Sequence, residues 1–348
     1  MKKVEVLIIG AGPAGSVCAN LLLKAGVDCL LIDHCTFPRD KICGGGLTSK
    51  TWHLLERLIP GVPYEYNPVS HIRLNVDNQA RCEFDIDEPI RIVQRKYFDH
   101  ALLKHYQDHG GEFIQGAPDK IEERDGQIFV TLKDGMQIAC HYLVGADGTN
   151  SFVRRYLKPD TDRGILAMEQ YVEKSGDNSI DVTLSQSYCI GGYFYRFPNK
   201  EYDIVGFGDA ATTPAKFRKV MNDNGVPEGK ARGAFIYLSN DYPLHDHIIL
   251  IGDAGGFANR STCEGLYDAM RTAENAAKAI TQNIPFRQVN AGIFRKMRKE
   301  MWVTKVFFSG FGFAIVKWLC HHPGAVKWIF DTKMRRETWL KKKDDSAR

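Results

Sequence analysis

Apolar positions in the first part of the chain predict two buried strands joined by a helix. Residues 4–9 form an apolar run rich in β-branched side chains, as expected of a strand buried on both faces of a parallel sheet. Residues 13–24 carry helical periodicity, and residues 28–33 repeat the buried-strand pattern. Together they predict a β-α-β unit, the repeating unit of α/β folds.

The hydrophobic pattern changes after residue 70, where polar and apolar residues alternate over short segments. Turn signals such as Asp125-Gly126 and Asp134-Gly135 separate these segments, which is typical of antiparallel hairpins. One helix interrupts them, at residues 96–109. The predicted strands of this part are 72–76, 81–85, 128–132 and 137–141.

The second half of the chain returns twice to the buried-strand pattern, at residues 142–146 and 247–251. A strand-rich region separates these two runs, a helix is predicted after the second, and an aromatic helical tail follows. The corresponding ranges are 163–240, 263–282 and 285–345. The pattern therefore predicts an α/β fold that is interrupted by an inserted antiparallel sheet and finished by helices.

Composition narrows the classes of protein. The 46 basic and 42 acidic residues nearly balance, so no overall field favours a nucleic-acid partner. Nine cysteines without a CxxC pair or zinc-type spacing predict free thiols in a reducing compartment and no metal site. The N-terminal apolar run is too short for a signal peptide, and the nearest candidate for a membrane span, residues 306–320, is also too short. We therefore expect a cytoplasmic location.

The first chemical motif follows the first predicted strand, where residues 10–15 read G-A-G-P-A-G. In a G-x-G-x-x-G fingerprint, Gly10 allows the tight turn, Gly12 admits a pyrophosphate to the backbone, and Gly15 allows close helix packing. The helix that begins here offers free N–H groups to the phosphates. Asp33 ends the second strand, where a carboxylate accepts hydrogen bonds from ribose hydroxyls and repels a 2′-phosphate. FAD or NAD is therefore expected, and NADP is not.

A second motif, P-R-D-K-I-C-G-G-G at residues 38–46, places three glycines after a basic loop. Such glycines suit a backbone pressed against a flat ring or a phosphate. Cys43 is the candidate catalytic residue. It is either a redox partner of a flavin or a small residue that lines the flavin pocket.

Together with these motifs, two later segments resemble the geranylgeranyl reductase family of FAD-dependent oxidoreductases, in particular its bacterial CbrA-like branch. The segments are Y-L-V-G-A-D-G-T-N-S-F-V-R-R at 142–155 and I-G-D-A-G-G-F at 251–257 followed by Glu264-Gly265. The resemblance covers about residues 1–283 and implies the p-hydroxybenzoate hydroxylase type of fold, with FAD between two domains. A Rossmann-like FAD-binding domain then comprises 1–70, 90–160 and 245–284, an antiparallel-sheet substrate domain 71–89 and 161–244, and a helical C-terminal region 285–348.

The same resemblance implies a set of FAD contacts. The last two of them place helix N-terminal amides at the pyrimidine edge of the flavin, where a reduced flavin carries negative charge. The contacts are Ala14 and Asp33 at the diphosphate and adenosine, Cys43, Gly44 and Gly46 along the flavin, Arg95, Ala117 on the adenine side, Asp253 at the ribityl chain, and Gly265 with Leu266.

Three polar residues in these motifs have a plain structural alternative. Asp147 either contacts the cofactor or caps the helix predicted to begin near Asn150. Asp253 either binds FAD or is only a helix cap. Arg260, near the last flavin loop, either binds an anionic group or charge on the flavin, or is a solvated surface arginine.

The predicted substrate pocket departs from the family pattern. Where many of these reductases read Tyr-x-Trp-x-Phe-Pro, this chain has Tyr193, Tyr195 and Phe197 before a proline, so the tryptophan is missing. We expect these three residues and Arg260 to line the pocket. Residues 203–211 resemble a second G-x-G-x-x-A nucleotide site. However, no second buried strand that ends in an acidic residue follows at the distance that a β-α-β unit requires. We expect an edge strand of the substrate sheet there.

The expected reaction is transfer of hydride from reduced flavin to a carbon–carbon double bond of a polyprenyl or other apolar lipid. The flavin would be reduced by an outside donor, NAD(P)H or a ferredoxin-type protein. Two alternatives stay open, a monooxygenase or halogenase of the same fold and a non-catalytic flavin sensor. The aromatic tail allows two interpretations, contact with the inner face of a membrane or closure of the substrate domain. Its aromatic residues are Trp302, Phe307, Phe308, Phe311, Phe313, Trp318, Trp328, Phe330 and Trp339.

Overall fold

The predicted β-α-β unit opens the fold of the computed structural model, which describes residues 1–159, 164–189, 191–239 and 241–334. Strands β1 (Lys2–Ile9) and β2 (Cys29–Asp33) pair in parallel, and helix α1 (Pro13–Lys24) connects them. All five residues of β2 are buried, as predicted for an interior strand.

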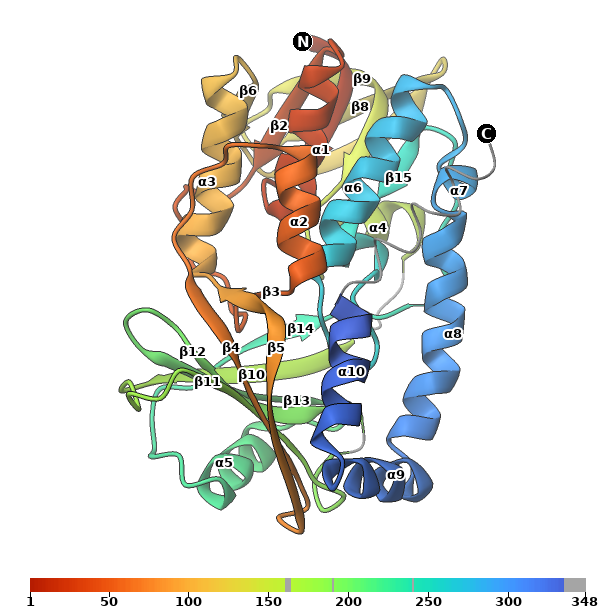
Figure 1. Cartoon of the computed structure of the whole chain (residues 1–348). Helices are drawn as coiled ribbons and strands as arrows, with labels where there is room; N and C mark the ends of the chain where they lie inside the picture. Colours follow the sequence, from red (N-terminus) through yellow and green to blue (C-terminus); the bar gives the residue numbers. More distant parts are fainter. Residues whose placement is uncertain (160–163, 190, 240, 335–348) are drawn as a thin grey trace.

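The first sheet has seven strands in the order β6-β2-β1-β9-β8-β7, with β15 paired to β9 (Figure 1). Strand β9 is one long strand where the sequence predicted two segments. Its first half pairs antiparallel with β8 and its full length pairs parallel with β1. The remaining bounds are β6 (Glu112–Gln115), β7 (Pro118–Arg124), β8 (Gln127–Leu132), β9 (Gln137–Gly145) and β15 (Ile248–Leu250).

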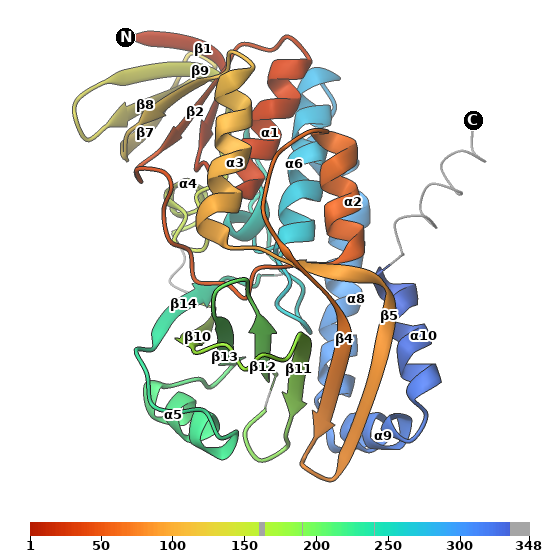
Figure 2. The same cartoon turned by 60° about the vertical axis from the view of Figure 1, so that its left-hand side comes forward.

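Helices cover one face of this sheet and position the cofactor motifs. α1 packs between α3 (Arg95–Asp108) and α6 (Leu266–Thr281), and α2 (Ser49–Leu58) packs on α6 (Figure 2). The helix α2 was not predicted from the sequence. The other face carries α4 (Phe152–Leu157), whose Val153 is buried against the sheet.

The second sheet has eight strands in the order β14-β10-β13-β12-β11-β4-β5-β3. Its neighbouring strands are antiparallel, as predicted, except that β11 pairs in parallel with β4. The chain leaves this sheet at the end of β5, residue 92, and returns at residue 165, so the hydrophobic pattern alone could not predict the relative direction of β11 and β4. The bounds are β3 (Gly46–Leu47), β4 (Asn67–Val76), β5 (Ala80–Ile92), β10 (Ile165–Val172), β11 (Ser179–Leu184), β12 (Tyr193–Pro198), β13 (Asp203–Asp209) and β14 (Arg232–Ile236).

One helix that was not predicted lies within the strand-rich region 163–240. Helix α5 (Pro214–Asp223) begins where the Thr213 hydroxyl accepts a hydrogen bond from the Lys216 N–H at 3.1 Å. Its apolar side, with Phe217 and Val220, packs on the sheet face that carries Phe207. The opposite face of the sheet is thereby left to the functional site.

The C-terminal region is helical, as predicted. α8 runs beside both domains, α9 lies across the end farthest from the first sheet, and α10 returns along β5 (Figures 1 and 2). The aromatic residues divide between two faces, because Phe307, Phe308, Phe313 and Phe330 pack on the second sheet while others are exposed. Trp339 and the basic run 341–343 lie outside the described residues. The bounds are α7 (Phe286–Val289), α8 (Ala291–Phe307), α9 (Gly310–Cys320) and α10 (Pro323–Met334).

Candidate cofactor and substrate site

The glycine fingerprint forms a turn that only glycine fits. Gly10 has φ +108°, and a side chain at Gly10 or at Gly15 would collide with the carbonyl oxygen of Ala146 or of Gly10, respectively. α1 begins directly after Gly12, and no side chain in the described part of the chain caps it. The first N–H groups of α1 are therefore available to an anion.

A half-buried arginine lies over this helix start. A methyl group added at Gly12 would be 3.4 Å from Arg39 Nη2, and Arg39 Nη1 is buried with no hydrogen-bond partner among the described residues. Asp99, which is fully buried, holds Arg39 at 3.2 Å and Arg95 at 2.7 and 3.0 Å. Burial opposes the charge of Arg95, but the Asp99 carboxylate outweighs burial and raises the pKa of Arg95 above its ordinary value. The unpartnered N–H groups of Arg39, near a helix start without a cap, are suited to binding a diphosphate.

Arg39 and Asp99 were not among the predicted site residues. Arg39 belongs to the basic loop that was singled out, so its position in that motif was a usable signal. Asp99 carries no such signal, because its role depends on α3 packing beside the loop.

Asp33 lies at the end of β2, as predicted, and both its oxygens accept backbone hydrogen bonds. Oδ2 accepts from the Ala11 N–H at 2.7 Å and Oδ1 from the Cys35 N–H at 2.8 Å. The carboxylate therefore orders the fingerprint turn. Ala117 lies close by, since the Asp33 carbonyl accepts a hydrogen bond from the N–H of Gly116. The two residues predicted for the adenosine side thus share one edge of the sheet.

Asp253 and Gly265 come together at the start of α6. A methyl group added at Gly265 would be 3.2 Å from Asp253 Oδ1, and one added at Gly252 would be 3.0 Å from the Ala14 side chain. α6 begins at Leu266 without a side-chain cap from any described residue, so Asp253 is not the cap of this helix. The short helix η1 (Gly252–Gly255) thereby brings a second uncapped helix start beside the first.

Asp147 caps α4. Its Oδ2 accepts hydrogen bonds from the N–H groups of Phe152 at 2.6 Å and Val153 at 3.2 Å, which confirms the structural alternative for this residue. The helix begins later than predicted because Ser151 is its N-cap and accepts from the Arg154 N–H at 2.8 Å. Burial raises the pKa of Asp147.

The Cys43 loop packs directly on the second sheet. Gly45 N–H points to Cys43 Sγ at 3.4 Å. A methyl group added at Gly44 would be 2.6 Å from Phe197 and 3.3 Å from Tyr195, and one at Gly46 would be 3.4 Å from Phe197. The residues predicted to line the flavin therefore meet the aromatic residues predicted to line the substrate pocket.

The loop before α6 is anchored from two sides. The Tyr193 hydroxyl donates to the Thr262 carbonyl, and Asn259 Nδ2 donates to Glu300 on α8 at 2.6 Å. Arg260 lies in this loop with Nε and Nη2 buried and without a partner among the described residues. Burial lowers its pKa. Arg260 is therefore not a solvated surface arginine, and its free N–H groups suit an acceptor.

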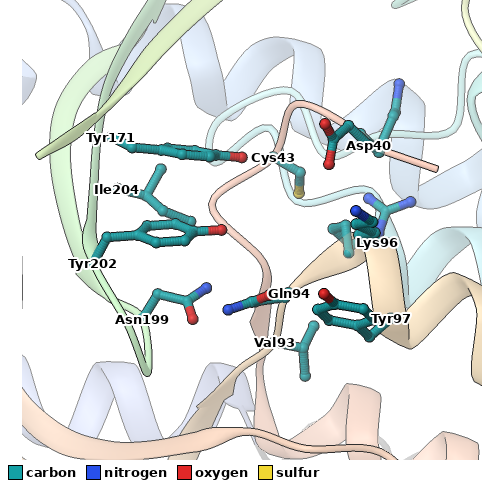
Figure 3. A pocket seen from close by; sticks show the side chains of 12 residues that line it. Asp40, Cys43, Val93, Gln94, Lys96, Tyr97, Tyr171, Asn199, Tyr202 and Ile204 are labelled. Atoms are coloured by element: carbon teal, nitrogen blue, oxygen red, sulfur yellow. The ribbon is translucent and has the colours of Figure 1, made fainter. Parts of the chain in front are cut away.

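A cavity of about 180 Å³ opens beside Cys43. In Figure 3, Tyr171 on β10 and Tyr202 in the turn between β12 and β13 face Cys43 and Lys96 across it, and the centroids of the two tyrosine rings are 4.3 Å apart. Tyr193, Tyr195 and Phe197 do not line this cavity, because their rings pack under the glycine loop. Its lining residues are Asp40, Lys41, Cys43, Val93, Gln94, Arg95, Lys96, Tyr97, Tyr171, Asn199, Tyr202 and Ile204.

The apparent second nucleotide motif is strand β13. It lies between β10 and β12, so it is an interior strand and the expected edge position is wrong. Its Gly206 provides room for the Tyr195 ring, which a side chain there would strike. Packing of the sheet therefore explains this glycine.

Sequence comparisons point to the same cofactor as the motifs described above. A profile described as an FAD binding domain matches residues 3–174. Menaquinone reductase of Mycobacterium tuberculosis is 34% identical, covering 79% of this chain and 76% of the relative. Digeranylgeranylglycerophospholipid reductase 3 of Methanosphaera stadtmanae is 27% identical, covering 89% and 88%. Protein CbrA of Escherichia coli O157:H7 is 29% identical, covering 98% and 100%.

Solved structures share the fold at lower identity. A geranylgeranyl bacteriochlorophyll reductase-like protein of Thermoplasma acidophilum has a TM-score of 0.76 at 18% identity, over 99% of both chains. The halogenase PltM, solved with phloroglucinol and FAD, has a TM-score of 0.72 at 18% identity, over 95% of this chain and 85% of that chain.

Proposed function

Since the chain belongs to the geranylgeranyl reductase family of FAD-dependent oxidoreductases, we propose that it reduces carbon–carbon double bonds in the apolar chain of a lipid. FAD is its cofactor, and when bound it supplies the hydride. The observation that carries the proposal is the contact between Gly44 in the Cys43 loop and Tyr195 and Phe197 of the second sheet. An aromatic surface at this position suits an apolar chain better than a charged substrate.

The chain's own residues would hold and tune the cofactor. The start of α1 and Arg39 would bind the diphosphate, with Asp99 fixing the arginine in place. The uncapped start of α6, at Gly265 and Leu266, would favour negative charge at the pyrimidine edge of the flavin. We propose that an outside donor, NAD(P)H or a ferredoxin-type protein, reduces the flavin.

The C-terminal helices support a lipid substrate. Four large aromatic side chains are mostly exposed on α8, α9 and α10: Trp302 at 68%, Phe311 at 71%, Trp318 at 61% and Trp328 at 68%. Residues 285–334 contain nine Lys or Arg and only two acidic residues. Exposed aromatic and basic side chains together are typical of helices that lie on an anionic membrane surface.

Among the described residues, no single helix is long and apolar enough to cross a membrane. α8 and α9 reach that length only together, and they are bent by 80° at their junction. We propose that α8 to α10 rest on the inner face of the membrane, where the protein would take its substrate.

The likeness to a halogenase favours one alternative, an enzyme whose reduced flavin reacts with oxygen. The test is to reduce the FAD-loaded protein without oxygen and add menaquinone or a digeranylgeranyl lipid. Reoxidation of the flavin, with gain of two hydrogen atoms by the lipid in mass spectrometry, is the expected result. Rapid oxygen use with hydroxylated or halogenated product would support the alternative, and stable reduced flavin in every mixture would support a sensor.

A further inference from the structure

Four residues form one row across the site face of the second sheet. Tyr195 on β12 pairs with Gly206 on β13, Gly206 pairs with Glu169 on β10, and Glu169 pairs with Arg232 on β14. Directly opposite residues in antiparallel strands share a face of the sheet. Because Gly206 has no side chain, the Tyr195 ring lies across β13 and its hydroxyl points to Glu169 Oε2 at 3.4 Å.

Glu169 is fully buried, and its second oxygen is unused. Its exposed fraction is 0%, and Oε1 has no hydrogen-bond partner among the described residues. A buried carboxyl group with a free oxygen is costly as a carboxylate, so a structural role alone does not explain it. Nothing in the sequence pattern singled it out except one acidic residue in a mostly apolar strand.

The surroundings of Glu169 act on its pKa in opposite directions, so neither the protonated nor the charged form is strongly favoured. Burial raises its pKa to about 7, and four groups oppose that rise: the Arg232 charge, the Cys43 N–H, the Tyr195 hydroxyl and the Arg95 charge. Tyr171, two residues along β10, is a further titratable group that interacts with it. A group with a pKa near the working pH can both hold and release a proton.

The row also reaches the predicted flavin side of the site. Tyr195 packs against Gly44, and the backbone N–H of Cys43 in the same loop is one of the groups that lower the pKa of Glu169. The Tyr195 hydroxyl therefore connects a buried acid to the place where the aromatic face and the Cys43 loop meet.

We propose that Glu169 stores the proton that completes saturation of the substrate and that the Tyr195 hydroxyl passes it on. This inference rests on the proposed function. The Tyr195 O–H bond breaks as a C–H bond forms on one carbon of the double bond, and the Glu169 proton moves to the Tyr195 oxygen. The other carbon receives the hydride that FAD supplies, so the lipid is reduced and the flavin oxidised. The Glu169 carboxylate, which is paired across the strands with Arg232, then regains a proton from solvent.

Infrared spectroscopy of the FAD-loaded oxidised protein measures the protonation state of Glu169 without any turnover. We expect a protonated-carboxyl C=O band that disappears as pH rises through about 7. The band should be absent in Glu169→Gln and kept in Tyr195→Phe. Glu173→Gln, which changes an exposed acid just beyond β10, is the matched control and should keep it. A band that Glu169→Gln retains would overturn the inference.

Lipid-driven reoxidation of the reduced protein in a single turnover tests the relay. We expect the wild-type rate to fall as pH rises through 7, and both Glu169→Gln and Tyr195→Phe to slow it about a hundredfold or more. Glu169→Gln should also lose the pH dependence, which a merely structural defect would not remove. Unchanged rates, or an unchanged pH profile, would overturn the relay while leaving the reductase proposal intact. A wild-type protein that no lipid reoxidises would overturn both, even if the infrared band titrates.

Discussion

Arg39 Nη2 lies against Gly12 and pairs with Asp99, while its Nη1 has no hydrogen-bond partner among the described residues. Hydrogen bonds to charged groups contribute about 1.5–3 kcal/mol each, so Arg39→Ala should weaken FAD binding about tenfold to a hundredfold. Titration of the FAD-free protein, followed by flavin fluorescence, measures the change. Arg81→Ala, at an exposed arginine on the β4–β5 hairpin, should bind FAD like the wild type. Equal affinity of the Arg39 and Arg81 variants would contradict this phosphate site.

Asp99 pairs with both Arg39 and Arg95 inside the protein. Removing one partner of a buried ion pair typically costs about 3–5 kcal/mol, because the remaining charge stays buried. Asp99→Asn should lower the free energy of unfolding by that order in urea denaturation. Asp108→Asn lies on the same helix but breaks an exposed pair with Lys104, so its effect should stay below about 1 kcal/mol. Similar losses in both variants would show that Asp99 has no special role.

The exposed aromatic residues of α8 to α10 should bind vesicles that contain anionic lipid. Changing Trp302, Trp318 and Trp328 together to serine should abolish cosedimentation with phosphatidylglycerol vesicles, since each carries apolar area into the interface. Added salt should weaken the wild-type binding, because the basic residues contribute through screened charges. Leu244→Ser changes an exposed apolar residue outside these helices and should leave binding unchanged. Full binding by the triple variant would rule out this surface.

Glu169 should also make stability depend on pH. Its pKa rises from 4.5 to about 7 on folding, so the folded protein binds this proton more tightly than the unfolded chain does. Stability should therefore fall as pH rises from 4.5 to 7 and stay lower above, by an amount on the order of 3 kcal/mol. Glu169→Gln should lack this loss, so it gains stability relative to the wild type between pH 5 and pH 8. Denaturant titrations at several pH values measure the difference, and a constant difference would disprove the shift.

Motifs that depend on a few neighbouring residues could be predicted from the sequence. The turn at Gly10 to Gly15, the acid at Asp33 and the cap at Asp147 all follow from local backbone rules. The order of strand, helix and strand around them was predictable for the same reason. The apparent second nucleotide motif at residues 203–211 shows the limit of such motif-based prediction. A glycine that makes room for a phosphate and one that makes room for a tyrosine ring look alike in sequence.

Composition and periodicity along the chain thus determined the class of fold, the cofactor motifs and the aromatic character of the tail. Only the tertiary structure decided that Arg39 meets Asp99, that β11 pairs in parallel with β4, and that Tyr195 reaches Glu169 across Gly206. These contacts join residues that are far apart in the chain, and their geometry is set by strand register and by the packing of whole layers. The same physical cause gives Glu169 its properties, since burial by distant elements shifts a pKa and no local pattern records it.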